Sequence, residues 1–229
     1  MTTPRLYGIS ASRAIRSLWA IEECGIDYEH VPVTFRKDSK SPNYLAVNPN
    51  GRIPALEDGD LVLFESMAIN LYLAKQYGGA LYPRDPRDEA RAVQWSVWVI
   101  AEMEEAQLQL VIQKMFTKEE NRDPAIWEAA GKKLARPLQV LEQALEGRQW
   151  LLGEAFSIAD LNVAAAMLLM PMVGFEYAEF ARVSEWAARC YARPALARAK
   201  ARDYPVVVLH MQVTVTASHV GAVMASGKG

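Results

Sequence analysis

The first residues that could do chemistry are Glu65 and Ser66, which directly precede an apolar-periodic segment. A position at the start of a helix offers unpaired backbone N–H groups and the positive end of the helix dipole, so a carboxylate can bind there. The Ser66 hydroxyl adds a hydrogen-bond donor, and the Glu65 carboxylate adds an acceptor for an ammonium group. The pair therefore suits the zwitterionic head of an amino acid. The alternative is that these two residues only cap the helix and bind no ligand.

Pro54, a short distance upstream, offers a second chemical possibility. It follows Ile53, and an X–Pro bond is the only peptide bond with an accessible cis form. If this bond is cis, the backbone N–H and C=O of Ile53 turn outward and can pair with a peptide-like ligand as a strand does. The alternative is that Pro54 is only a turn residue.

The residues between these two features predict the elements that position them. Two short apolar runs, 53–56 and 61–64, flank Asp58-Gly59, which favours an antiparallel β-hairpin. The helix then begins at Glu65-Ser66 and continues to about Tyr77. Both chemical features therefore lie at the ends of one hairpin.

An earlier segment predicts a βαβ unit. A strand at 5–8 is followed by a helix at 13–25, with Gly25 as its C-cap, and by a second strand at 28–33. The crossover between the two strands makes them parallel. We expect Arg16, Glu22 and Glu23 to form the polar surface of the helix. The complete order, βαβ-ββα, predicts a thioredoxin-like domain.

The stretch from Lys40 to Tyr77 also carries a family pattern. It contains Asn-Pro-x-Gly-x-Ile-Pro-Ala-Leu, then Asp-Gly, then Glu-Ser-x-Ala-Ile-x-x-Tyr-Leu. This pattern resembles the glutathione-contacting region of cytosolic glutathione transferases, particularly the phi/theta-like and related bacterial branches. The resemblance implies a thioredoxin-like domain followed by an all-helical domain, a cis proline, and glutathione as co-substrate.

The resemblance also implies which residues bind glutathione. Lys40, in Lys40-Ser41-Pro42, matches a lysine that contacts the glycyl carboxylate in phi-type enzymes. The alternative for Lys40 is a solvated loop charge. The glutathione-binding residues that we expect are Lys40, Arg52, Ile53, Pro54, Glu65 and Ser66.

Glutathione transfer needs the thiolate, because a free thiol titrates near about 8.5 and its protonated form is a weak nucleophile. A hydroxyl or a backbone N–H at the start of the first helix can favour the anion by hydrogen-bonding the sulfur. Counting from the first strand places the family's serine at Ser12, whereas counting back from the helix end places it at Ala11. We expect Ser12 to be catalytic, with Ser10 as the second candidate. Tyr7 is a third, although its place in a strand favours a core role.

The rest of the chain predicts an all-helical domain. Apolar residues from Trp95 to Met115 mark one long helix. Ser157 and Asp160 form a Ser-x-x-Asp capping box before a buried helix, and we assign both to folding. The predicted division is a thioredoxin-like domain at 1–80, a linker at 81–88, a helical domain at 89–205 carrying the hydrophobic substrate site, and a tail of uncertain structure at 206–229.

The implied reaction is attack of the thiolate on a small hydrophobic electrophile held by the helical domain. Its wall is expected on the long helix, at Met103, Gln107, Leu110, Val111 and Met115, although such residues are more often core. No cysteine lies near the two serines, so conjugation or glutathione peroxidation fits better than disulfide exchange. Two alternatives stay open: a non-catalytic glutathione-fold binding or interaction protein, and a glutathione-dependent isomerase, dehalogenase or lyase.

Composition sets the remaining expectations. Twenty-five basic and 27 acidic side chains give a formal charge of −2 without a basic block, so we expect neither nucleic acid nor a membrane as partner. The three histidines are scattered, so no metal is expected. Cys24 and Cys190 are far apart, and residues 1–4 show no secretory signal, which favours a cytoplasmic protein. The resemblance implies a homodimer with a role in detoxification.

Overall fold

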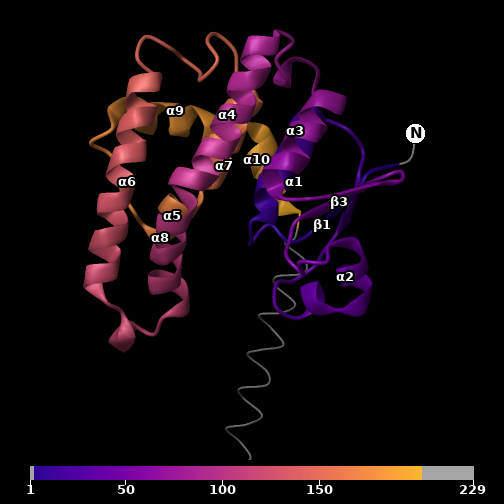
Figure 1. Cartoon of the computed structure of the whole chain (residues 1–229), viewed down its shortest axis with the longest axis horizontal. Coiled ribbons are helices and arrows are strands. Elements are labelled where there is room, and N and C mark those ends of the chain that lie inside the picture. Colours follow the sequence, from indigo (N-terminus) through magenta and orange to yellow (C-terminus); the bar gives the residue numbers. More distant parts are fainter. Residues whose placement is uncertain (1–2, 203–229) are drawn as a thin grey trace, which may run out of the picture.

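The computed structural model describes residues 3–202, so the predicted tail at 206–229 lies outside the described residues. The strands gather on one side with α1 and α3 beside them, and the helices from α4 to α9 form the other side (Figure 1). The N-terminal elements are β1 (Arg5–Tyr7), α1 (Ala14–Cys24), β2 (Glu29–Val31), a 3₁₀ turn (Asp38–Lys40), α2 (Pro42–Val47), β3 (Ala55–Asp58), β4 (Leu61–Phe64), α3 (Ser66–Tyr77) and a second 3₁₀ turn (Gly79–Leu81).

The four strands form one mixed sheet in the order β2-β1-β3-β4. β1 and β2 are parallel, whereas β3 is antiparallel to both β1 and β4. This confirms the predicted βαβ-ββα order. The hairpin turn lies one residue later than the sequence pattern placed it, because Asp58 pairs with Leu61 and leaves Gly59-Asp60 as the loop. Gly59 takes a φ of 65°, a conformation that glycine adopts without a steric cost.

The helix α1 lies against the sheet and ends at Gly25, which has the predicted left-handed C-cap conformation with a φ of 66°. The expectation that Arg16 and Glu22 are surface residues is wrong, since they are only 2% and 6% exposed. Each forms an ion pair with an oppositely charged side chain from the C-terminal half of the chain. Glu22 accepts hydrogen bonds from Arg198 and Arg202, which ties the end of the described chain to α1.

The C-terminal half is helical, as predicted. Its elements are α4 (Pro86–Glu102), α5 (Glu104–Val111), a π-helix (Ile112–Phe116), a 3₁₀ turn (Glu119–Asn121), α6 (Pro124–Ala144), α7 (Ile158–Met167), α8 (Leu169–Val173), α9 (Ala181–Tyr191) and α10 (Pro194–Ala201). The single long helix predicted up to Met115 is wrong. Met103, with φ −116° and ψ −33°, separates α4 from α5. Apolar periodicity misses this break because buried residues recur on both sides of it.

The central helix α7 has every residue buried. Its start is the predicted capping box: the carboxylate of Asp160 accepts hydrogen bonds from the backbone N–H and the hydroxyl of Ser157. The same carboxylate accepts from the Leu151 N–H and the Trp186 indole N–H. Asp160 therefore organises the helical core, and its role in folding is confirmed.

Candidate functional site

A cavity of about 190 Å³ lies where α1, α3, α5 and the loop before β3 meet. It is lined by Arg13, Arg16, Asn48, Arg52, Ile53, Pro54, Glu65, Ser66, Met67, Ile100 and Glu104. The predicted glutathione-binding residues among them are Arg52, Ile53, Pro54, Glu65 and Ser66. The structure thus brings these five predicted residues together in one place.

The loop before β3 is held by hydrogen bonds that the sequence pattern did not reveal. The hydroxyl of Tyr44 and the amide of Asn48 both donate to the carbonyl oxygen of Arg52, each at 2.7 Å. The Ile53–Pro54 bond that follows is cis, as the resemblance implied. Asn48 is 2% exposed, so the amide that holds this loop through its hydrogen bond to Arg52 is buried. Asn followed by Pro and Gly is a turn signal, and it could have pointed to Asn48.

The opposite wall is the start of α3. Ser66 is the first residue of this helix and is 6% exposed. Glu65, just before it, has a φ of 71° and a ψ of 113°, which is uncommon for a residue with a side chain. Such backbone strain costs about 1–3 kcal/mol and is concentrated at ligand sites. With this backbone conformation, Glu65 and the N-terminus of α3 both lie at the cavity.

Three charged side chains form the third wall. Glu104, the first residue of α5, pairs through one carboxylate oxygen with Arg13 and through the other with Arg16, at 3.0 Å. Burial opposes ionisation of Glu104, but the attraction of the two guanidinium groups outweighs it and holds the pKa of Glu104 below its ordinary value. The carboxylate partner of Arg13 thus comes from the helical half.

The two catalytic candidates lie in the loop before α1 but do not line the cavity. The hydroxyl of Ser12 donates to the carbonyl oxygen of Ile9 at 2.6 Å and accepts from the Ala14 N–H at 3.0 Å. Ser12 thus satisfies backbone groups at the start of α1. Ser10 reaches the carbonyl oxygen of Lys200 at 3.5 Å. The adjacent Arg13 lines the cavity, so Ser12 is one residue from its wall.

Lys40 also lies outside the cavity lining. It is exposed, and its ammonium group donates to the carbonyl oxygen of Asn50 at 3.2 Å. Because Asn50 belongs to the loop that leads to Arg52 and Ile53, Lys40 lies beside the cis-proline side of the site. Its predicted contact with a ligand stays a prediction.

The hydroxyl of Tyr7 is engaged in a hydrogen bond within the sheet rather than offered to a thiol. Its hydroxyl donates to a carboxylate oxygen of Glu57 at 2.5 Å, within the sheet. Burial, aided by this bond to Glu57, raises the pKa of Tyr7 to about 12. Because the phenol proton is already held by an anion, Tyr7 is a structural residue of the sheet.

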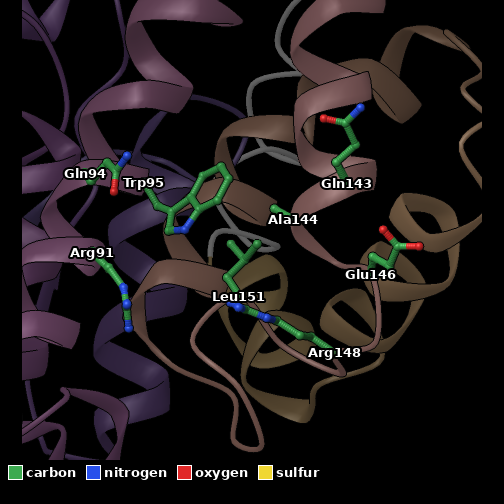
Figure 2. Close-up of a pocket in the computed structure, with 8 residues that line it drawn as sticks. All are labelled: Arg91, Gln94, Trp95, Gln143, Ala144, Glu146, Arg148 and Leu151. Carbon is green, nitrogen blue, oxygen red and sulfur yellow. The ribbon is translucent and has the colours of Figure 1, made fainter.

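A larger cavity of about 380 Å³ lies between α4 and the C-terminal end of α6. Figure 2 shows Arg91, Gln94 and Trp95 on one side and the other labelled residues around it. Its lining is Arg91, Gln94, Trp95, Gln143, Ala144, Glu146, Arg148 and Leu151, and it includes no predicted site residue. Within residues 3–202, no group of three or more His, Cys, Asp and Glu could hold a metal ion.

The expected wall for the electrophile is mostly core. Met103, Gln107, Leu110 and Val111 are buried, and among the five predicted wall residues only Met115 is exposed. An exposed aromatic pair lies nearby instead: the ring centroids of Phe35 and Phe116 are 6.2 Å apart and nearly perpendicular. The Arg36 guanidinium lies over both rings. These contacts join the loop after β2 to the π-helix.

The mixed sheet with its cis-proline loop and flanking helices defines a thioredoxin-like domain, which is followed by a helical domain. Residues 3–75 match the family model of the glutathione S-transferase N-terminal domain, and residues 102–194 match that of the C-terminal domain. The chain belongs to the glutathione S-transferase family.

Similar proteins agree with this assignment. A glutathione S-transferase of Hyoscyamus muticus is 35% identical over 209 residues, covering 85% of this chain and 96% of the relative. Glutathione S-transferase 4 of Zea mays is 33% identical over 208 residues, covering 85% and 92%. The theta class glutathione S-transferase of Xanthomonas axonopodis pv. citri, solved with glutathione bound, has a TM-score of 0.80, 33% identity and coverage of 87% and 97%. The protein is a glutathione transferase, and glutathione is its co-substrate.

Proposed function

We propose that the smaller cavity binds the γ-glutamyl end of glutathione. The observation that carries this proposal is the position of Ser66 at the N-terminus of α3, on a cavity that also contains Glu65. The helix N-terminus and the Ser66 hydroxyl would bind the ligand's α-carboxylate. The Glu65 carboxylate would bind its ammonium group. Both ends of the zwitterion then have a partner.

The rest of glutathione would extend along the cis-proline loop. The backbone of Ile53 would pair with the cysteinyl residue, as one strand pairs with another, beside Pro54. Arg52 and Lys40 supply positive charge at the far end, where the glycyl carboxylate would lie. The hydrogen bond from Lys40 to Asn50 keeps its ammonium group close to this loop.

The thiol would then lie near the start of α1. Rotation of the Ser12 hydroxyl away from the Ile9 carbonyl would let it donate to sulfur and stabilise the thiolate, with Ser10 as the second candidate. The thiol proton leaves to solvent, and the thiolate forms a C–S bond with the electrophile. The electron pair of the broken bond departs with the leaving group. The enzyme contributes positioning and pKa lowering rather than a covalent intermediate.

The electrophile is proposed to bind beside the exposed pair Phe35 and Phe116, with Met115 next to them. Aromatic and methionine side chains bind small hydrophobic compounds without directional hydrogen bonds. These residues come from both halves of the chain. Small hydrophobic electrophiles are therefore the proposed second substrate class.

We also propose a homodimer. The helix α4 exposes Ala90, Val93, Val97 and Ala101, which recur every three or four residues and form an apolar stripe. Phe64 on β4 is a further exposed apolar side chain. A long exposed apolar stripe is uncommon on a monomer and suits a second copy. Light scattering at micromolar concentration should give the dimer mass, and a monomer would contradict the proposal.

The predicted division into domains at 1–80 and 89–205 is supported by the two family matches, since the N-terminal match lies within the first range and the C-terminal match within the second. The linker at 81–88 and the cytoplasmic location stay predictions. Among the described residues, no helix is both long and apolar enough to cross a membrane.

The substitution Ser66→Ala tests the site. It should weaken glutathione binding by about 0.5–1.5 kcal/mol, or about two- to tenfold, because it removes one hydrogen bond to the ligand. Isothermal titration calorimetry measures this directly. Ser184→Ala is the matched control, because Ser184 donates to the Tyr177 carbonyl in the helical half. Equal affinities of wild type and Ser66→Ala would remove Ser66 from the site.

A further inference from the structure

One buried cation on α1 lacks a full set of partners. The Arg16 side chain is 2% exposed, and its Nη1 donates to a Glu104 oxygen at 3.0 Å. Its second terminal nitrogen, Nη2, is buried and has no hydrogen-bond partner among residues 3–202. Leaving a charged donor unpaired inside a protein costs free energy. An acceptor at Nη2 would remove this cost.

The cavity offers a place for that acceptor. Arg16 lines it together with Glu65 and Ser66. Glu65 acts on Arg16 electrostatically, but the ion pair of Arg16 is with Glu104. A guanidinium with one nitrogen already bound can still bind a carboxylate through the other, at a strength typical of charge-assisted hydrogen bonds. The free nitrogen thus fits an anionic group of the ligand.

We propose that Arg16 binds the α-carboxylate of the γ-glutamyl residue, so that this carboxylate is held from α1 as well as from the start of α3. The inference rests on the proposed function of the cavity. Arg16 then determines specificity: it favours thiols that carry an α-carboxylate on a γ-glutamyl group over thiols that lack it. Glu104 is a positioning residue, since it holds the guanidinium without contacting the ligand.

The proposal links the two halves of the chain. Glu104, which positions Arg16, comes from α5, whereas the groups that would bind the carboxylate come from α1 and α3. Recognition of glutathione by the N-terminal half therefore depends on a side chain of the helical half. A purely structural ion pair would lack this dependence on the ligand's carboxylate.

The test compares two ligands on the full chain by calorimetry: glutathione, and 4-aminobutyryl-cysteinyl-glycine, which lacks only the α-carboxylate. Wild type should bind glutathione more tightly. The Arg16→Lys variant, which keeps a charge beside Glu104, should lose about tenfold or more in affinity for glutathione. Its affinity for the analogue should change less than about twofold, because the lost partner is absent from that ligand.

A second variant keeps the test decisive if Arg16→Lys does not fold. Arg16→Gln combined with Glu104→Gln removes both buried charges together, and circular dichroism reports whether it is folded. Arg91→Gln is the matched control, because Arg91 lies in the larger cavity and pairs with Asp88. It should leave both affinities unchanged.

The outcomes separate the two proposals. A folded Arg16 variant that keeps the wild-type preference for glutathione overturns the inference, and so does an equal loss for both ligands. If wild type binds glutathione but shows no preference over the analogue, the inference fails together with the proposed contact of the carboxylate with Ser66, while glutathione binding itself stands. If wild type does not bind glutathione, the proposed function of the cavity fails first.

Discussion

The two cavities described among residues 3–202 differ in how their polar groups are held. The larger one, of about 380 Å³, lies within the helical half and is bordered by exposed side chains such as Arg91 and Arg148. The smaller one, of about 190 Å³, is bordered by the buried Arg16, by the start of α3 and by a cis-proline loop. Large cavities are the usual first candidates for a ligand site. Here the buried Arg16 and the helix N-terminus favour the smaller cavity as the proposed ligand site.

The two cavities also differ in how much their ion pairs contribute to the stability of the folded protein. The smaller cavity draws its walls from both halves of the chain, and the Glu104 carboxylate joins them through Arg13 and Arg16. The larger cavity lies between helices of one half, where the salt bridge of Arg91 with Asp88 is exposed. Exposed pairs contribute little to stability, whereas breaking a buried pair leaves an uncompensated charge. The proposed glutathione site therefore also joins the two halves of the chain.

The largest expected effect is on stability. Glu104→Ala should lower the free energy of unfolding by about 3–5 kcal/mol, because it leaves Arg16 buried without its counter-charge. Arg148→Ala, in the larger cavity, should change it by less than about 0.5 kcal/mol, because Arg148 is exposed. Urea denaturation of both variants measures this. Similar losses for the two would remove the contrast between the cavities.

A smaller effect is expected on acid stability. The pKa of Glu104 is lowered in the folded state from an ordinary value of 4.5, so its ion pairs stabilise the protein fully above that value. This contribution is lost as the pH falls through the lower, folded-state pKa. Glu104→Gln should therefore show a shallower loss of unfolding free energy than wild type between about pH 5 and pH 3. Chemical denaturation across this range measures the slope.

The exposed Glu128 provides the control for that experiment, because its ion pair with Lys132 lies on the surface. Glu128→Gln should keep the wild-type dependence of stability on pH. If Glu104→Gln kept it too, the buried pair would not contribute to acid sensitivity.

The subtlest comparison is between two serines of one loop. Ser12→Ala should leave glutathione binding largely intact but raise the pKa of the bound thiol, because it removes a donor to sulfur. Loss of its bond to the Ala14 N–H should also lower the free energy of unfolding by about 1 kcal/mol. Ser10→Ala should do neither. If Ser10→Ala raised the thiol pKa instead, the predicted order of the two catalytic serines would be wrong.

The sequence predicted features whose signals are local. The hairpin and the helix start at Ser66 lie within one continuous stretch, where turn residues and apolar runs act on their neighbours. The cis bond at Pro54 was implied by the family resemblance, because the residues alone also fit a simple turn. The capping box of Ser157 and Asp160 is local in the same way. The order of elements in the sheet follows from these signals together with the chirality of parallel connections.

The missed features depend on residues far apart in the chain. Arg16 and Glu104 are 88 positions apart, and nothing near Arg16 distinguishes a buried partner from a solvated surface charge. The fixing of the cis-proline loop by Asn48 was missed because a buried amide and an exposed turn residue have the same sequence pattern. The break at Met103 was missed because apolar periodicity continues through it.

Whether the smaller cavity binds glutathione and activates its thiol can be measured by an ultraviolet titration of thiolate absorbance for glutathione bound to the purified wild-type protein, with calorimetry confirming occupancy. Glutathione should bind, and the pKa of its bound thiol should lie well below that of free glutathione. Binding with an unchanged thiol pKa would contradict activation and favour a non-catalytic binding protein, and no binding would contradict the assignment of the cavity.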